Sequence, residues 1–160
     1  MPEKMYRAPE VIDMEQLLSD TRQLVSEQQV ALNRMIEYCK HLVKCQNSKQ
    51  SANLRIPYLV IHGGAGTGKS TIIKIMSRWI CKTLQTPGDD TDYSYFIKAA
   101  PTGKAAANIG GTTLHSVFKL NFGHNYKFLS DKNREYMRDI FKNVQVIIID
   151  EFSMIQSDQL

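Results

Sequence analysis

Apolar residues in the first part of the chain recur at the spacing of a helix. They would share one face of that helix: Leu32, Met35, Ile36, Cys39, Leu42 and Val43. Residues 26–29, with the sequence Ser-Glu-Gln-Gln, have the pattern of a capping box that starts it. Residues 46–55 are polar and lack a period, which is typical of a surface loop. We therefore predict an N-terminal helical segment over residues 1–55.

A different pattern begins after this segment. Short apolar runs at 58–62, 95–100 and 144–150 each end in turn-forming or acidic residues, which is typical of strands buried on both faces of a sheet. Amphipathic helical patterns at 68–84 and 131–143 lie between these runs. Because strands and helices alternate, we expect an α/β fold with a parallel sheet flanked by helices.

A glycine-rich stretch follows the first apolar run and fits the pattern G-x-x-x-x-G-K-[ST]. Glycines let the backbone curl so that successive N–H groups point at phosphate oxygens. Lys69 then supplies a charge for the β and γ phosphates, and Ser70 supplies a hydroxyl for magnesium. The following helix adds the positive end of its dipole. We predict an ATP and Mg²⁺ site built from Gly63, Gly64, Ala65, Gly66, Thr67, Gly68, Lys69, Ser70 and Thr71.

Two acidic residues, Asp150 and Glu151, end the third apolar run. The carboxyl end of a parallel strand is where ligands bind in such sheets. We expect Asp150 to hold the magnesium shell together with Ser70. Glu151, on the other side of the strand, would polarise a water in line with the γ-phosphate. With Lys69, the pair forms the predicted catalytic set, and it favours an ATPase over a passive nucleotide sensor.

The stretch 99–118 follows the second apolar run and carries a candidate anion-binding helix start. Thr102 and Gly103 can begin a helix whose free N–H groups face an anion, with Lys104 beside them. Residues 110–113, Gly-Gly-Thr-Thr, predict a second tight turn with donors suited to sugar-phosphate contacts.

Two ring side chains in the same stretch are candidates for contact with bases. His115 and Phe118 could stack on the bases of a single strand. The alternative is a plain connection between a strand and a helix, with Phe118 in the core. The residue pattern alone leaves both interpretations open.

Three motifs in this order, GGAGTGKS, APTGKAAANIGGTTLHSVF and VIIIDEFSMI, resemble the superfamily-one DNA helicases of the petite-integration-frequency type, relatives of RecD. LVSEQ at 24–28 is similar to the adenine-reading segment of that family, which would make Gln28 the residue that recognises the base. A glutamine amide offers one donor and one acceptor to a base edge. The resemblance spans about residues 24–157.

The resemblance implies a RecA-like P-loop domain over 56–160, incomplete here. It implies ATP-dependent 5′-to-3′ unwinding and translocation on single-stranded DNA, in repair, recombination or telomere maintenance. The implied DNA contacts are Thr102, Gly103, Lys104, Thr112 and His115. The family's second motor domain and its arginines do not follow Leu160, so we expect the N-terminal part of a helicase, with weak ATP binding and little turnover alone.

Two other functions remain open. One is a P-loop kinase that phosphorylates a nucleoside or nucleotide, which would need an arginine-rich lid, whereas residues 121–143 contain only Arg134 and Arg138. The other is a module that binds a nucleotide or single-stranded DNA without turnover. A response of ATP hydrolysis to single-stranded DNA separates these functions.

Composition adds limits rather than chemistry. The net charge of the chain is +4, and the positive charge is concentrated in residues 31–82, which contain nine Lys or Arg residues and a single acidic residue, Glu37. Such a basic segment is compatible with a polyanion partner. No apolar run approaches the ~18 residues that span a bilayer, and no secretory signal is evident. Three cysteines without a CxxC pair indicate reduced thiols. We expect an intracellular protein, nuclear or mitochondrial if eukaryotic, with no small-molecule substrate besides ATP and water.

Overall fold

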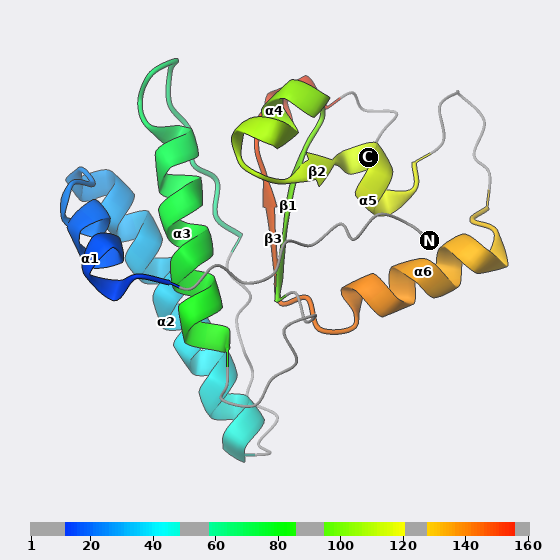
Figure 1. The fold of residues 1–160 in the computed structure, drawn as a ribbon, viewed down its shortest axis with the longest axis horizontal. Coiled ribbons are helices and arrows are strands. Elements are labelled where there is room, and N and C mark those ends of the chain that lie inside the picture. The colour runs from blue at the N-terminus through cyan, green and yellow to red at the C-terminus, as the bar shows by residue number, and fades with distance from the viewer. Residues whose placement is uncertain (1–11, 49–57, 86–94, 121–127, 156–160) are drawn as a thin grey trace. The chain divides into compact units, whose positions relative to one another are not determined.

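The computed structural model describes residues 12–48, 58–85, 95–120 and 128–155 (Figure 1). Its elements are α1 (Met14–Arg22), α2 (Ser26–Ser48), α3 (Lys69–Leu84), β1 (Phe96–Ala100), α4 (Gly103–Asn108), β2 (Thr112–Thr113), α5 (Leu114–Phe118), α6 (Asp131–Phe141), β3 (Val146–Ile149) and the 3₁₀ helix η1 (Phe152–Met154). They form two compact units. The first contains α1 to α3, and the second contains β1 to η1.

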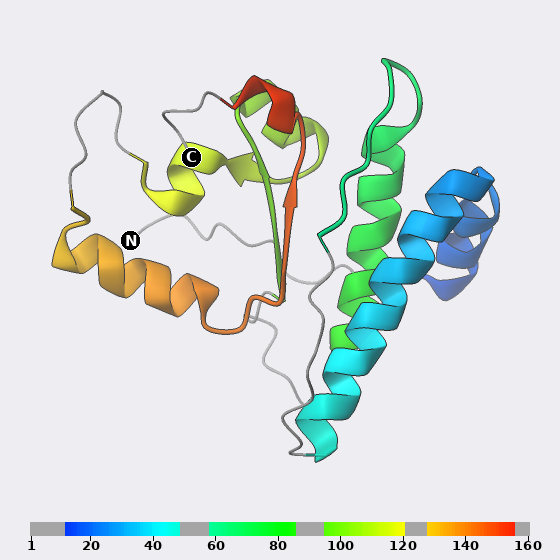
Figure 2. The same ribbon diagram turned by 180° about the vertical axis from the view of Figure 1, so that it is seen from behind.

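The first unit is built on two long helices, because α2 runs alongside α3 in both views (Figures 1 and 2). The helix predicted around residues 32–43 is confirmed. The buried apolar residues of this unit are Leu17, Leu24, Ala31, Leu32, Met35, Cys39, Ile72, Ile73, Ile75, Met76, Ile80 and Leu84. Helices from both sides of residue 55 share this core, while the division of the chain at that residue stays a prediction.

The start of α2 differs from the predicted capping box. The Ser26 hydroxyl donates to the Glu27 carboxylate at 3.0 Å instead of capping the helix. The Gln29 amide donates to the Leu24 carbonyl at 2.8 Å. The backbone N–H of Val25 donates to the Gln28 side-chain oxygen at 3.2 Å. The glutamine whose side chain accepts from the residue before the helix is therefore Gln28 and not Gln29. The reason is that α2 begins at Ser26, so Val25, and not Ser26, is the residue that flanks the helix.

The second unit contains a three-stranded parallel sheet with the order β2-β1-β3. The strands predicted at 95–100 and 144–150 are confirmed, with Phe96 opposite Val146 in the register of β1 and β3. The helix predicted at 131–143 is α6, which begins where the Ser130 hydroxyl accepts from the N–H of Asn133 at 3.3 Å. The buried residues of this unit's core cluster are Ile97, Ala99, Leu114 and Val117.

Two strand predictions need correction. The run at 58–62 is not a strand, since no described strand pairs with it, and Tyr58 and Val60 are 92% and 69% exposed. Apolar character alone does not make a strand without a neighbour that accepts its hydrogen bonds. β3 is not buried on both faces either, because Ile147 and Ile149 are 44% and 39% exposed while Val146 is buried.

Candidate nucleotide-binding loop and nucleic-acid interface

The glycine-rich loop ends in a turn that only glycine adopts without strain. Gly66 and Gly68 have φ angles of 77° and 79°, in the left-handed region. A Cβ atom on Gly63 would lie 2.7 Å from the Thr67 hydroxyl, so the loop also folds back closely on itself. Gly68 precedes α3 without a side-chain cap. The start of α3 therefore follows a curled glycine backbone and has no side-chain cap, which is compatible with a phosphate site.

Lys69 lies within the curl of this loop. Its ammonium group donates to the carbonyls of Gly63 at 2.8 Å and Gly64 at 2.7 Å. The Thr67 hydroxyl donates to the same Gly64 carbonyl at 2.9 Å. These bonds hold the positive charge beside the loop backbone. Ser70 follows in the first turn of α3 and is partly buried.

The loop backbone is open to a nucleoside triphosphate at two of its glycines. Cβ atoms built on Gly64 or Gly66 would meet nothing within 4 Å, so a ligand can approach the backbone there. Ala65 and Thr71 are exposed on the same stretch. Uncapped helix amides, a lysine and a serine hydroxyl together match the chemistry of bound phosphate and magnesium.

Gln28 joins this loop from the first turn of α2. Its side-chain nitrogen donates to the carbonyl of Thr67 at 3.0 Å, across 39 positions of sequence. Its side-chain oxygen accepts from Val25, as described above, and so both ends of the amide are engaged. A Cβ atom on Gly68 would lie 2.9 Å from the Gln28 nitrogen. The structure therefore brings the predicted base-reading residue to the predicted phosphate loop.

The two acidic residues belong to the second unit. Asp150 is 7% exposed, and its N–H donates to the Ala99 carbonyl at 2.9 Å, which extends the pairing of β1 with β3 by one residue. Its carboxylate accepts from the N–H of Glu151 at 3.0 Å. The two acids lie together in one unit, and Lys69, Ser70 and Gln28 lie together in the other.

Glu151 has an unusual backbone. β3 ends at Ile149, so strand alternation does not set the direction of the Glu151 side chain as the sequence had suggested. Its φ angle of 52° is left-handed, which is uncommon for a residue other than glycine, and its side chain is exposed. Such strain is found preferentially at functional positions.

Three of the predicted DNA-contacting residues, Thr102, Gly103 and Lys104, lie at the carboxyl end of the sheet. Because β1 and β3 are parallel, α4 and η1 leave the same end, which Figure 2 shows. Thr102 precedes α4, and its hydroxyl accepts from the N–H of Ala105 at 3.3 Å. Thr102, Gly103 and Lys104 are all exposed. Asp150 lies at this end too, so one edge of this unit carries an acid and a helix start.

The predicted turn at 110–113 is shorter than expected. Gly110 has a φ angle of 61°, and a Cβ on Gly111 would collide with the Lys98 carbonyl. Thr112 and Thr113 instead form β2, opposite Ala99 and Ala100 of β1. Close approach to β1 makes the chain after the glycines a strand, because its backbone groups find ladder partners there.

The ring side chains of this stretch differ in role. Phe118 stacks on Phe141 with ring centroids 5.6 Å apart and packs against the core cluster. Phe118 therefore packs against the core, as the alternative expected, and stacking of its ring on bases stays a prediction. The Thr113 hydroxyl caps α5 by accepting from the N–H of Ser116 at 3.3 Å. His115 lies in α5 and is partly buried.

In the described part of the chain, no three His, Cys, Asp or Glu residues lie close enough together to hold a metal ion. The same residues include no helix that is long and apolar enough to cross a membrane. Cys39, Cys45 and Cys81 take part in no disulfide within the described ranges.

A protein-family model described as an AAA domain matches residues 46–160. The chain belongs to this family. The match covers the glycine-rich loop, the second unit and both acids, so the AAA domain contains every predicted site residue except Gln28. The prediction of a P-loop α/β fold with a parallel sheet is confirmed by this match and by the observed strands.

Curated relatives of this AAA domain are named ATP-dependent DNA helicases of the Pif1 type. The PIF1 helicase of Mus musculus is 30% identical over 143 residues, which cover 88% of this chain and 18% of the mouse protein. That of Homo sapiens is 35% identical over 98 residues, 60% of this chain and 14% of the human protein. The Pif1 helicase of Campylobacter jejuni is 30% identical over 106 residues, 61% of this chain and 22% of that protein.

These relatives confirm the resemblance to helicases of the petite-integration-frequency type. The chain spans less than a quarter of the length of each of the three relatives. No solved structure matches the chain.

The hydrogen bond between Gln28 and Thr67 is the feature of the site that sequence reasoning did not foresee. Its acceptor is a backbone carbonyl, a group that every residue has, so the residue type at position 67 does not reveal the bond. Only the joint presence of LVSEQ and GGAGTGKS signals that the two stretches meet.

Proposed function

We propose that this AAA domain binds and hydrolyses ATP within an ATP-dependent DNA helicase that moves 5′ to 3′ on single-stranded DNA. The observation that carries the proposal is the position of Lys69 within a glycine loop that Gln28 contacts. A lysine held beside uncapped helix amides is suited to a triphosphate, and a glutamine beside the same loop is suited to a purine edge. The names of the relatives supply the link to DNA.

Each residue of the site would have a distinct role. Lys69 would neutralise charge on the β and γ phosphates, and the loop amides from Gly63 to Thr71 would hold the phosphate oxygens. Ser70 and Asp150 would hold Mg²⁺, which supplies charge neutralisation when bound. Glu151 would accept a proton from the attacking water.

The DNA-binding role is proposed for the exposed edge of the second unit. Thr102, Gly103 and Lys104 are exposed and would contact phosphates, while Thr112 and His115 would contact the sugar-phosphate backbone and a base. Such contacts carry no sequence specificity. Service in DNA repair, recombination or telomere maintenance belongs to the same proposal, as does a nuclear or mitochondrial location in a eukaryotic source.

The test is steady-state ATP hydrolysis with Mg²⁺, with and without single-stranded DNA, for this chain and for any longer natural form that contains it. Lys69→Ala is the blank. DNA-stimulated hydrolysis in the longer form, with unwinding of a 5′-tailed duplex, supports the proposal. Phosphate transfer to a nucleoside that ignores DNA would instead support a kinase. A kinase would need an arginine-rich lid, and residues 121–143 contain only Arg134 and Arg138.

A further inference from the structure

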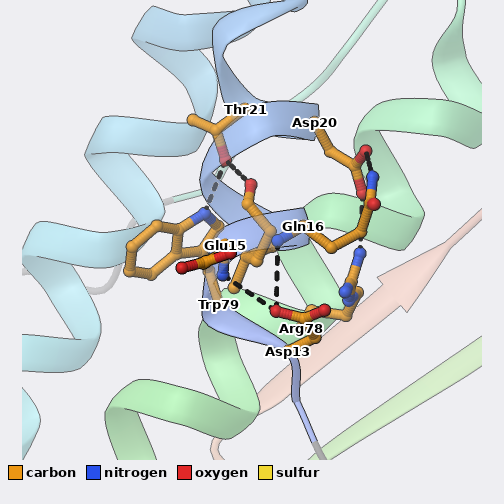
Figure 3. A network of polar contacts seen from close by, with 8 residues as sticks. Asp13, Glu15, Gln16, Asp20, Thr21, Arg78 and Trp79 are labelled. Carbon is orange, nitrogen blue, oxygen red and sulfur yellow. Dashed lines mark hydrogen bonds and ion pairs between the residues drawn. The ribbon is translucent and has the colours of Figure 1, made fainter.

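Two neighbouring polar pairs fasten α1 to the middle of α3 (Figure 3). Arg78 donates to the Asp20 carboxylate at 2.7 Å, and the Trp79 indole N–H donates to the Thr21 hydroxyl at 2.9 Å. Each pair joins residues 58 positions apart. Consecutive residues of α3 thus contact consecutive residues of α1, which fixes both the position and the rotation of α1.

The acceptors of these pairs are themselves held in place. The second carboxylate oxygen of Asp20 accepts from the Gln16 amide at 2.6 Å, and the Thr21 hydroxyl donates to the Leu17 carbonyl at 2.7 Å. Leu17 is fully buried beneath them. The Arg78 and Asp20 side chains are only 28% and 27% exposed, so their charge-assisted bond is better shielded from water than an ordinary surface ion pair.

The chain between these pairs and the nucleotide loop is short and well packed. After α1, the N–H of Leu24 donates to the Thr21 carbonyl at 3.2 Å, and the Leu24 side chain is buried. α2 begins two residues later, and its first turn carries Gln28 to the Thr67 carbonyl. Residues 20–28 are therefore attached at one end to the middle of α3 and at the other end to the loop that precedes α3.

We propose that the Asp20–Arg78 and Thr21–Trp79 pairs are positioning contacts that hold Gln28 at the nucleotide loop and so set the affinity for the adenine base. The proposal rests on ATP binding at this loop. None of the four side chains touches the loop in a described contact; they act through the rigid helix α3 and the turn that leads into α2. Loss of a pair would let the amide of Gln28 spread over several positions, while Lys69 and the loop amides would still bind phosphate.

Trp79→Phe and Thr21→Val test the proposal, because the first removes the indole N–H and keeps an aromatic ring, and the second removes the hydroxyl and keeps the branched shape of the side chain. We would measure binding of ATP and of inorganic tripolyphosphate by calorimetry, with Mg²⁺. Each variant should weaken ATP binding about 2- to 10-fold, as expected for one hydrogen bond, and leave tripolyphosphate binding unchanged. Equal weakening of both ligands would overturn the proposal, since it would indicate general loosening of the fold.

Thr83→Val is the matched control. The Thr83 hydroxyl donates to the Trp79 carbonyl at 2.8 Å within α3 and so belongs to the same helix without reaching α1. This variant should bind ATP like the wild type. Arg78→Lys should keep most of the affinity for ATP because it keeps a positive charge beside Asp20. Arg78→Met removes that charge and should weaken ATP binding as the other variants do. Equal behaviour of Lys and Met at position 78 would contradict the positioning role.

A double-mutant cycle separates this proposal from the proposed function. In a Gln28→Ala background, Trp79→Phe should have no further effect on ATP affinity, because the residue that it positions is gone. Additive losses would overturn the inference. If the wild type binds ATP and Gln28→Ala weakens it while Trp79→Phe does not, only this inference fails. If the wild type binds neither ATP nor tripolyphosphate, the proposed function fails, and this inference falls with it.

Discussion

The side-chain nitrogen of Gln28 lies 3.0 Å from the carbonyl oxygen of Thr67 and donates a hydrogen bond to it. This bond joins the start of one long helix to the loop that starts the other. It also places an amide, rather than a charged group, beside the loop. If the loop binds ATP as proposed, the identity of residue 28 would bear on which nucleotide the loop accepts.

Gln28→Glu should weaken ATP binding about fivefold and reduce the preference for ATP over GTP. The substitution replaces the donor with a second acceptor facing the Thr67 carbonyl, and one lost hydrogen bond is worth about 1 kcal/mol. Competition binding with ATP and GTP measures both effects. Glu27→Gln is the matched control because Glu27 is exposed and contacts Ser26 rather than the loop. An unchanged ATP-to-GTP ratio would remove Gln28 from base recognition.

Glu151→Gln should preserve ATP binding and lower hydrolysis at least a hundredfold in the DNA-stimulated enzyme. An amide keeps the size of the side chain but cannot accept a proton at neutral pH, and general-base catalysis contributes about 10²- to 10⁴-fold. Single-turnover hydrolysis together with equilibrium binding tests this. The control is Glu135→Gln on α6, which alters an exposed carboxylate of the same unit. Turnover equal to that of the wild type would refute the role of Glu151.

Gly111→Ala should destabilise the second unit by about 1 to 3 kcal/mol. The added methyl group would collide with the Lys98 carbonyl, and a backbone atom of a strand cannot move aside as a side chain can. Urea unfolding followed by circular dichroism measures the loss. Gly103→Ala is the comparison, since a Cβ there meets nothing within 4 Å and an alanine favours the helix. Similar midpoints for both variants would contradict the predicted clash.

Cys39 should be the last of the three cysteines to react with iodoacetamide. It is fully buried in α2, and burial raises the pKa of its thiol to about 11 from an ordinary value of 9.0, so almost no thiolate forms near neutral pH. Cys45 and Cys81 are only partly buried. Peptide mass spectrometry after timed labelling gives the order. Modification of Cys39 at the rate of the other two under native conditions would contradict its burial.

The same thiol makes stability depend on pH in the alkaline range. Because the folded pKa is raised, the folded chain keeps a proton that the unfolded chain releases, so stability is constant below about pH 9 and falls towards pH 11. Burial also raises the pKa of Tyr38, helped by the neighbouring Cys39, and this acts in the same direction. Cys39→Ala should flatten the decline, as measured by thermal melting between pH 8 and pH 11.

Local periodicity predicted the three longest helices, α2, α3 and α6, and local apolar runs predicted two of the strands. The stripe from Leu32 to Val43 and the apolar runs at 95–100 and 144–150 are local patterns, which can be recognised from a few neighbouring residues. The run at 58–62 failed because a strand exists only when a neighbour accepts its hydrogen bonds, and that is not a local property. Thr112, which was expected in a turn, is a strand residue because β1 lies beside it and pairs with it.

The site was predictable where a motif specifies the backbone. The left-handed glycines before α3 and the buried Asp150 follow from the loop pattern and from the end of a buried strand. The pairs between α1 and α3 were not predictable, because a single arginine and a single tryptophan in an amphipathic helix carry no sign of their partners 58 positions away. Tertiary contacts between side chains need the fold itself.

The left-handed backbone of Glu151 places a conformational strain at the residue that is proposed to be catalytic. Glycine would adopt this conformation freely, so Glu151→Gly should relax the turn and raise stability by about 1 kcal/mol. The same exchange would delete the carboxylate proposed to activate water. Selection for a long-lived fold alone would favour glycine after Asp150, so the glutamate at this position is the choice expected if its carboxylate has the proposed catalytic role.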